Sequence, residues 1–505
     1  MNPCRPKATE AETRAPLRVF VFRITGRVSN ISLRFVGFSA SLLIMAVQRT
    51  IPEFPDDFVF GVAAAAYQIE GAVTEDGRGR SIWDEFCSVP GAIVRGETGD
   101  IAIDHYHRYR DDVRLMRELG TDSYRLSVSW PRIQPDGKGE VNPAGLDFYD
   151  RLVDELCAAG ITPAVTLFHW DLPQALQDDG GWLNRATAQR LAEYAAIVGE
   201  RLGDRVGMWM PLNEPVVHTL YGHALGVHAP GLSLGFGALQ AAHHQLLGHG
   251  LSVQALRSAG CGNIGIASNH APVHAASDSE ADIEAADIYD HIVNWTFADP
   301  VLLGKYPADE LAALLTGPVD DDLAIIAQPL DWFGINYYEP TIIAAPRDGE
   351  GTEGVLEVDL PPGMPFAPVP LEGYPKTDFG WPIVPDGLRE ILTIFRDRFG
   401  AALPPVYITE SGCSFHDPDP DSSGRVRDDR RIAYHADHLA AVREAMDAGV
   451  DVRGYFVWSI LDNFEWAAGY RERFGLVHVD YDTLERTPKD SYYWFRDLLA
   501  KRHGG

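Results

Sequence analysis

Two short stretches of the chain place a glutamate directly after an apolar run. Residues 209–215 read W-M-P-L-N-E-P, and residues 405–409 run into Glu410. Apolar runs of this length are typical of buried strands, and Pro215 cannot donate the next ladder hydrogen bond, so the first strand should end there. Glu214 and Glu410 are therefore predicted to lie at the C-terminal ends of two strands. Such a pair is what a two-carboxylate active site on a parallel barrel would look like.

From residue 58 onward, strand-like runs alternate with helical ones. Amphipathic segments such as 146–156 and 432–446 have the spacing of helices that bury one face. Parallel strands need helical crossovers, so eight such units predict an α/β fold: a single (β/α)8 TIM barrel with elaborated loops at the C-terminal face of the strands. The expected strands are 58–65, 123–129, 162–168, 206–212, 263–268, 332–337, 405–409 and 453–459. Glycines 120, 160 and 449 are expected to end helices in the left-handed conformation.

The first 48 residues differ in composition from the rest of the chain. No repeat, low-complexity tract or linker divides the sequence after residue 50, so residues 49–505 are predicted to form one catalytic barrel domain. Residues 1–44 instead hold seven Lys or Arg against two acids, and the apolar run 35–47 is too short for the ~20 residues that span a bilayer. We interpret residues 1–48 as an N-terminal extension, either disordered or upstream of a true start at Met45, with a targeting segment as the alternative.

The charge and cysteine content limit the partners of the protein. The formal net charge of -29 argues against nucleic acid or an anionic membrane as partner, because both require clustered Lys and Arg. The five cysteines form no C-x-x-C pair. Reduced thiols and a cytoplasmic setting are therefore expected, with no structural zinc. No other metal and no cofactor are predicted.

The loops that follow the expected strands carry residues suited to a sugar. Amide, histidine and acidic side chains can hydrogen-bond hydroxyl groups, while indole faces can stack on the C–H face of a pyranose. Tryptophans at strand ends are also common as plugs of the core, so their clustering at one rim is the informative feature. The residues are Gln68, Glu70, Trp130, His169, Trp170, Asn213, Glu214, Asn269, Asn336, Tyr338, Glu410, Trp458, Glu465 and Trp466.

These residues belong to motifs by which the chain resembles glycoside hydrolase family 1, the β-glucosidase family. The motifs run in order from about residue 54 to the C-terminus. They are FGVA and YQIEG (60–71), SIWD (81–84), YRLS and SWPR (124–132), LFHWDLP (167–173), NEP (213–215), GINYY (334–338), ITESG (408–412), and WS, DNFEW and RFG (458–475). Two departures are Ser411, where the family usually has asparagine, and Arg80, where it usually has proline.

The resemblance implies retaining hydrolysis by two glutamates. Glu410 is the expected nucleophile, with Arg125 as the cation that keeps it ionised and Tyr338 as a hydroxyl that steadies it. Glu214 is the expected acid and then base. The charge on Glu410 should hold the proton on Glu214 until the glycosyl ester forms. The retaining mechanism predicts carboxyl groups about 5 to 5.5 Å apart.

The resemblance also implies a set of substrate-binding residues. Asn213 is expected at the 2-hydroxyl, an interaction that tightens in the transition state. The others are Gln68, His169 and Trp458 at the 3-hydroxyl, Glu465 at the 4- and 6-hydroxyls, Trp466 beside them, and Trp170, Asn336, Tyr338 and Phe474 around the same pocket.

The function implied is that of a β-glucosidase acting on terminal non-reducing β-D-glucosyl residues, with β-galactosides, β-fucosides and transglycosylation also open. The partners expected are small β-glycosides or oligosaccharides, without nucleic acid or membrane; a homo-oligomer is compatible with the sequence. One alternative is a 6-phospho-β-glycosidase, which Glu465 disfavours by repelling phosphate. A catalytically inactive sugar-binding protein is the other. The leaving group stays open, because residues 216–231 and 344–378 surround it with loops of unknown conformation.

Overall fold

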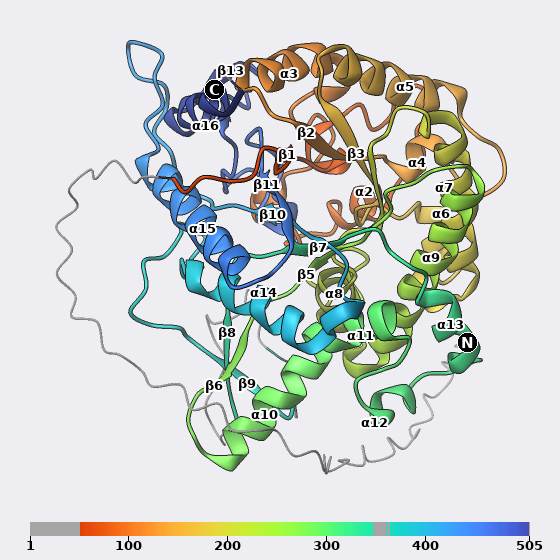
Figure 1. The fold of residues 1–505 in the computed structure, drawn as a ribbon. Coiled ribbons are helices and arrows are strands. Elements are labelled where there is room, and N and C mark those ends of the chain that lie inside the picture. The colour runs from red at the N-terminus through yellow and green to blue at the C-terminus, as the bar shows by residue number, and fades with distance from the viewer. Residues whose placement is uncertain (1–50, 347–359, 361–363, 504–505) are drawn as a thin grey trace, which may run out of the picture. The chain divides into compact units, whose positions relative to one another are not determined.

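The structure is a computed structural model that describes residues 51–346, 360 and 364–503. The predicted N-terminal extension, residues 1–48, lies outside this part of the chain. Figure 1 shows a central group of strands with helices arranged around it. This is the architecture that alternating strands and helices predict.

Eight parallel strands form the barrel and confirm the predicted fold. They are β1 (Val59–Ala63), β2 (Ser123–Ser127), β3 (Thr162–Phe168), β4 (Met208–Leu212), β5 (Ala267–Asn269), β7 (Phe333–Asn336), β10 (Val406–Ser411) and β11 (Val452–Trp458). Their order in the sheet is β4-β3-β2-β1-β11-β10-β7-β5. Isolated parallel bridges from Trp209 to Ile264 and from Asn213 to Ala267 join its two ends. The sheet thereby closes on itself, so all eight strand tips surround one central space.

Helices connect successive strands and cover the outside of the barrel (Figure 1). The longer ones are α3 (His105–Leu119), α5 (Pro143–Ala158), α7 (Ala186–Leu202), α9 (Leu239–Ser258), α10 (Glu280–Asp290), α11 (Thr296–Leu303), α13 (Val319–Ile326), α14 (Pro385–Phe399), α15 (Asp429–Asp447) and α16 (Asp490–His503). Gly120, Gly160 and Gly449 have φ angles of 81°, 76° and 96°. Each follows a helix, as predicted, in the left-handed region that glycine adopts without a Cβ clash.

Short elements decorate the loops. The helical ones are α1 (Ala66–Ile69), α2 (Ile82–Phe86), α4 (Trp130–Ile133), α6 (Gln174–Asp178), α8 (Pro215–Val217), α12 (Asp309–Ala312), η1 (Val94–Gly96), η2 (Gly181–Leu183), η3 (His218–Leu225), η4 (Gly235–Ala238), η5 (His291–Trp295), η6 (Gly400–Ala402) and η7 (Trp466–Ala468). Two small sheets contain β6 (Val273–Ala275), β8 (Thr341–Ala344) and β9 (Ala367–Val369), and β12 (Val477–Val479) and β13 (Arg486–Pro488). The sequence did not predict these strands, because three or four residues are too few to show an alternating pattern.

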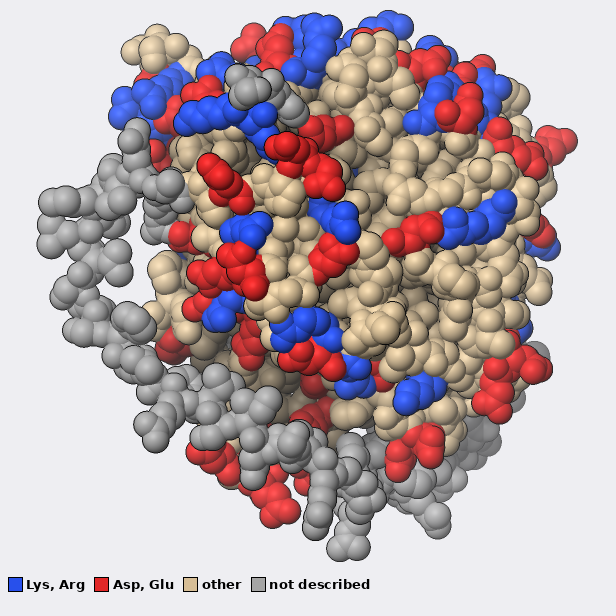
Figure 2. All heavy atoms as spheres, viewed as in Figure 1, with Lys and Arg blue, Asp and Glu red and all other residues tan. Residues whose placement is uncertain are grey.

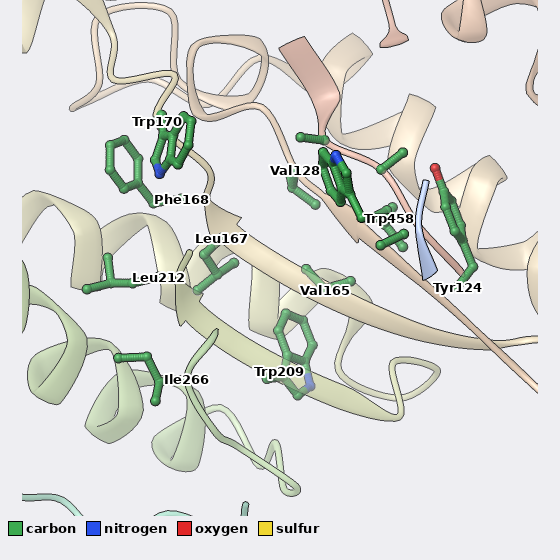
Figure 3. Close-up of a cluster of buried hydrophobic side chains, with 14 of the residues drawn as sticks. Tyr124, Val128, Val165, Leu167, Phe168, Trp170, Trp209, Leu212, Ile266 and Trp458 are labelled. Carbon is green, nitrogen blue, oxygen red and sulfur yellow. The ribbon is translucent and has the colours of Figure 1, made fainter. Parts of the chain in front are cut away.

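The strands are apolar because both of their faces are buried. Along β4, Met208 and Met210 join a small cluster with Trp332 and Phe456, whereas Trp209 between them joins the main core. Figure 3 shows Trp209 beside Val165 and other buried side chains of this main core. Strands covered on two sides read as continuous hydrophobic runs, which is the pattern that the sequence shows.

Charges of both signs are interspersed over the surface. On the face shown in Figure 2, Lys and Arg lie among Asp and Glu without forming one basic area. Among the described residues, no helix combines the length and the hydrophobicity needed to span a bilayer.

A buried ion network holds the loop after β11. The ammonium of Lys489 lies 2.7 Å from Asp462 and 2.6 Å from Asp417, and all three side chains are almost completely buried. Arg473 binds Asp462 at 2.8 Å. Burial favours protonation of Asp462, but the neighbouring cations Lys489, Arg473 and Arg431 hold its pKa below the usual value. Because Asp462 and Arg473 belong to the loop of residues 459–475, this network fixes the conformation of that loop.

We expect Lys489→Ala to lower the free energy of unfolding by about 3–5 kcal/mol, because two buried carboxylates lose the cation they share and keep Arg473 and Arg431 as partners. Lys138→Ala is the matched control. Its ammonium is 44% exposed and pairs with Asp179 at the surface, so the expected cost is below about 1 kcal/mol. Denaturant unfolding curves of both variants measure the difference, and equal losses would contradict a role for the network.

Candidate active site

Glu410 lies in β10 and is held by two neighbours. Nη1 of Arg125, from β2, donates to its Oε1 at 2.5 Å, and the hydroxyl of Tyr338 donates to its Oε2 at 2.8 Å. Burial, followed by the charges of Glu410 and Glu214, raises the pKa of Tyr338 well above its usual value, so Tyr338 keeps its proton. Both carboxylate oxygens are thus fixed by charge-assisted hydrogen bonds. Glu410 lies within the strand and not after it, because β10 extends to Ser411.

Glu214 follows β4 and begins the short helix α8. Its φ angle is 43°, which a residue other than glycine rarely adopts. Its Oε1 accepts hydrogen bonds from the side-chain amides of Asn336, at 2.8 Å, and Asn269, at 3.3 Å. Burial is the main cause that raises the pKa of Glu214 to about 8, and the negative charge of Glu410 adds to it. Glu214 is therefore protonated at neutral pH.

A chain of hydrogen bonds links the two glutamates through Asn213. Nη2 of Arg125 donates to Oδ1 of Asn213 at 2.5 Å, and Nδ2 of Asn336 reaches the same oxygen at 3.1 Å. Nδ2 of Asn213 lies 3.0 Å from Nε2 of His169. Burial, with the charge of Arg125, lowers the pKa of His169 well below its usual value. A neutral His169 can accept this bond at Nε2, so the orientation of Asn213 is determined on both sides.

A second polar group joins opposite ends of the sequence. Nε2 of Gln68 donates to Oε2 of Glu465 at 3.2 Å and to the backbone oxygen of Phe464 at 2.9 Å. Oε1 of Gln68 is buried and has no hydrogen-bond partner among the described residues. Such an acceptor is suited to a hydroxyl group of a ligand.

Aromatic rings form one side of the site. Trp466 lies against Trp170, with ring centroids 4.7 Å apart, and stacks with Tyr67 at 6.2 Å and His169 at 5.9 Å. His169 also stacks with Trp458 at 5.7 Å. Trp170 and Trp466 have φ angles of 75° and 46°. Together with Glu214, three non-glycine residues of this site adopt the left-handed conformation, a type of strain that concentrates at functional sites.

These groups surround a cavity of about 400 Å³ at the strand tips. Nine of the predicted catalytic and substrate-binding residues line it: His169, Trp170, Glu214, Tyr338, Glu410, Trp458, Glu465, Trp466 and Phe474. Gln68, Asn213, Asn336 and Arg125 are buried behind the lining and contact it through the hydrogen bonds described above. The structure therefore brings the predicted catalytic and substrate-binding residues together in one place. Glu70 and Trp130, which were also expected at the strand tips, do not line the cavity: Glu70 is paired with Arg132, and Trp130 is buried in the core against Tyr194.

Some residues of the site were not predicted. Asn269 was expected at a strand tip, but its contact with Glu214 was not. Asn463, which accepts from Gln68 at 3.2 Å, lies in the DNFEW motif but was given no role, and His228, which lines the cavity, lies in the loop of residues 216–231 but was not singled out. Trp381 also lines the cavity and lies 5.3 Å from Tyr338, ring to ring. Only the three-dimensional path of the loops identifies these residues.

The described residues contain no group of three or more His, Cys, Asp or Glu arranged to hold a metal ion. Asp417, which begins an acidic segment, is instead paired with Lys489 and Arg431.

Two carboxyl groups in different surroundings, one facing a guanidinium and one facing amides, lie beside indoles at the tips of a (β/α)8 barrel, and this arrangement is typical of a glycoside hydrolase. The family model described as Glycosyl hydrolase family 1 matches residues 50–504. The chain therefore belongs to glycosyl hydrolase family 1, and it is an O-glycosyl hydrolase.

Individual relatives agree with this assignment. Beta-glucosidase A of Acetivibrio thermocellus is 45% identical over 452 residues, which cover 88% of this chain and 98% of the relative. Thermostable beta-glucosidase B of Thermobispora bispora is 49% identical over 455 residues, 89% of this chain and 91% of the relative. The solved structure of the family 1 β-glucosidase from Thermotoga maritima in complex with isofagomine lactam superimposes with a TM-score of 0.83, at 42% identity, and covers 90% of this chain and 100% of that one.

The pKa of Glu214 leads to a pH prediction. Below about pH 8 this residue is protonated and could donate to a leaving oxygen, and above about pH 8 the proton is lost. We expect kcat/KM for phenyl β-glucoside to fall as the pH rises through about 8. In Glu214→Ala, assayed with 2,4-dinitrophenyl β-glucoside, whose leaving group needs no proton, this decline should be absent. A decline that persists in the variant would assign it to another group.

Proposed function

We propose that the protein is a retaining β-glucosidase that releases terminal non-reducing β-D-glucosyl residues, with Glu410 as nucleophile and Glu214 as acid and base. The observation that carries this proposal is the opposite environment of the two carboxyl groups. Glu410 is paired with the guanidinium of Arg125, whereas the hydrogen-bond partners of Glu214 among the described residues are amides, and Glu214 is protonated at neutral pH.

In the first step, Glu410 attacks the anomeric carbon while Glu214 gives its proton to the glycosidic oxygen. The C–O bond to the leaving group breaks, the alcohol departs, and an ester joins the sugar to Glu410. The negative charge of Glu410, which raises the pKa of Glu214, disappears as the ester forms. Glu214 therefore becomes a stronger acid, and after the step it is a carboxylate that can act as a base.

In the second step, Glu214 takes a proton from water as the water oxygen attacks the anomeric carbon. The ester bond to Glu410 breaks, and glucose leaves with the configuration of the substrate. Two inversions at the same carbon give retention, and both residues return to their starting states. This retaining mechanism predicts that the carboxyl groups of Glu214 and Glu410 lie about 5 to 5.5 Å apart.

The sugar is held by the groups on the other side of the cavity. His169 uses only one of the two amide hydrogens of Asn213, so the second can be donated to the 2-hydroxyl. Gln68, with its unpartnered Oε1, and Glu465 are positioned as one unit for the 3-, 4- and 6-hydroxyls. Trp458, Trp466 and Phe474 complete the apolar side of the pocket. β-Galactosides and β-fucosides differ at these positions, and their ranking stays a prediction.

Two alternatives have less support. A 6-phospho-β-glycoside would meet Glu465, together with Ala467 and Ala468, where it needs cations. A sugar-binding protein without activity would not require both glutamates in their matched environments.

We also propose a cytoplasmic location, because Cys87, Cys261 and Cys413 are free and buried, as thiols of a reducing compartment are.

The test is hydrolysis of a panel of 4-nitrophenyl β-glycosides by the wild type and by Glu410→Ala. The wild type should release 4-nitrophenol fastest from the glucoside. The variant should lose activity by a factor on the order of 10⁴ or more, and azide should restore turnover with α-glucosyl azide as product, because azide can enter the space left by the carboxylate.

The outcomes separate the candidates. A wild type that hydrolyses none of the glycosides but binds gluconolactone would replace this proposal with the sugar-binding alternative. A product of β configuration from Glu410→Ala with azide would assign the nucleophile to another residue.

A further inference from the structure

The part of the cavity near Glu214 and Tyr338 has an apolar wall. Its side chains come from α8, η3, η5, β8 and the loop before α14, and each is only half-buried. They are Val217, Leu220, Val293, Ile342, Leu371 and Trp381. We refer to these six residues as the apolar wall. Half-buried apolar side chains that face a cavity gain free energy when a ligand removes them from water.

The apolar wall lies on the leaving-group side of the catalytic pair. Val217 and Leu220 follow Glu214, the proposed proton donor, by three and six residues along α8 and η3. Trp381 contacts Tyr338, which binds Glu410, with ring centroids 5.3 Å apart. Gln68 and Glu465, by contrast, come from the loops after β1 and β11. A sugar held by those two residues directs its glycosidic oxygen toward Glu214 and therefore its leaving group toward the apolar wall.

Several polar side chains on this side already have hydrogen-bond partners; His228, whose buried Nδ1 has none among the described residues, is an exception. Asn294 uses both amide hydrogens and its oxygen in bonds to neighbouring protein groups. The amide nitrogen of Asn269 donates to Glu214, and the side chains of Tyr289 and Thr341 form a hydrogen bond with each other. A second sugar in this place would bring several hydroxyl groups that lose water without gaining these partners, and each such loss weakens binding.

Two charged residues also line this side. Lys376 is exposed, and its ammonium lies 3.8 Å from Glu372, so solvent reaches it. Glu339 is half-buried, beside Tyr338 in the sequence. Neither Lys376 nor Glu339 is one of the six side chains of the apolar wall.

On the basis of the β-glucosidase function given above, we propose that the leaving-group subsite selects β-glucosides with an apolar alkyl or aryl aglycone over those whose leaving group is a second sugar. Selection comes from burial of the aglycone against the apolar wall. The glucose-binding residues and the two glutamates serve both kinds of substrate alike.

A series of n-alkyl β-glucosides from butyl to octyl tests this preference, with cellobiose as the sugar-leaving comparison. The alcohols of the series have nearly equal acidity, so differences in kcat/KM report burial of the chain. We expect kcat/KM to rise roughly two- to fourfold with each methylene until the wall is covered. Octyl β-glucoside, below its micelle concentration, should exceed cellobiose by about tenfold or more, although its alcohol is the poorer leaving group.

Variants locate the effect. Leu220→Asn should lower the ratio of the octyl to the cellobiose kcat/KM by about tenfold, because an amide replaces apolar surface. Leu303→Asn is the matched control: Leu303 lies on α11, outside the cavity, and is 38% exposed, so the ratio should not change. If Leu220→Asn does not fold, Val293→Thr, which keeps the side-chain shape, should lower the ratio in the same direction.

Each contrary result has its own meaning. A flat alkyl series, a preference for cellobiose, or a ratio that neither wall variant changes would overturn the apolar-aglycone inference while leaving the β-glucosidase function intact. Absence of hydrolysis of every glucoside, 4-nitrophenyl β-glucoside included, would instead overturn the proposed function.

Discussion

The guanidinium of Arg125 is the group on which the rest of the site depends. It is buried in the barrel at 1% exposure, and it binds Glu410 through one nitrogen and Asn213 through another. A buried cation needs anionic or polar partners, and Arg125 finds them in Glu410 and Asn213. Through Asn336 the same set of bonds reaches Glu214. The guanidinium of Arg125 thus positions both carboxyl groups of the site.

The two proposed catalytic glutamates were predictable at strand ends because barrel strands have a strong sequence signal. Glu214 and Glu410 follow or end continuous apolar runs, and closure of the sheet brings the tips of β4 and β10 to one face. Asn336 could be placed for the same reason, whereas Arg125 lies in the middle of β2 and was indicated by the family motif YRLS. The strand before Glu410 was predicted to end at residue 409, whereas β10 extends to Ser411 and includes Glu410. Such boundaries depend on hydrogen bonds to neighbouring strands, which a single segment does not reveal.

The loops could not be predicted in the same way. Gln68 and Glu465 lie about 400 positions apart, and nothing in either segment alone indicates their hydrogen bond. The path of residues 459–475 depends on the buried Lys489, which pairs with Asp462 from another part of the chain. Similarly, the apolar wall combines residues from five elements, each of which looks like ordinary core in sequence. Sequence pattern therefore indicates the chemistry of the site, whereas the choice of leaving group depends on tertiary contacts.

The central claim is that Glu410 forms a covalent bond to the sugar. Its most direct test is inactivation with 2-deoxy-2-fluoro-β-D-glucosyl fluoride, in which the fluorine at C2 slows both steps while the fluoride leaving group keeps formation of the glycosyl ester fast, so the ester accumulates. Intact-mass measurement followed by peptide mapping should find one fluoroglucosyl group per chain, on the peptide that contains Glu410. A label on Glu214 or Glu465, or inactivation without any label, would contradict the account.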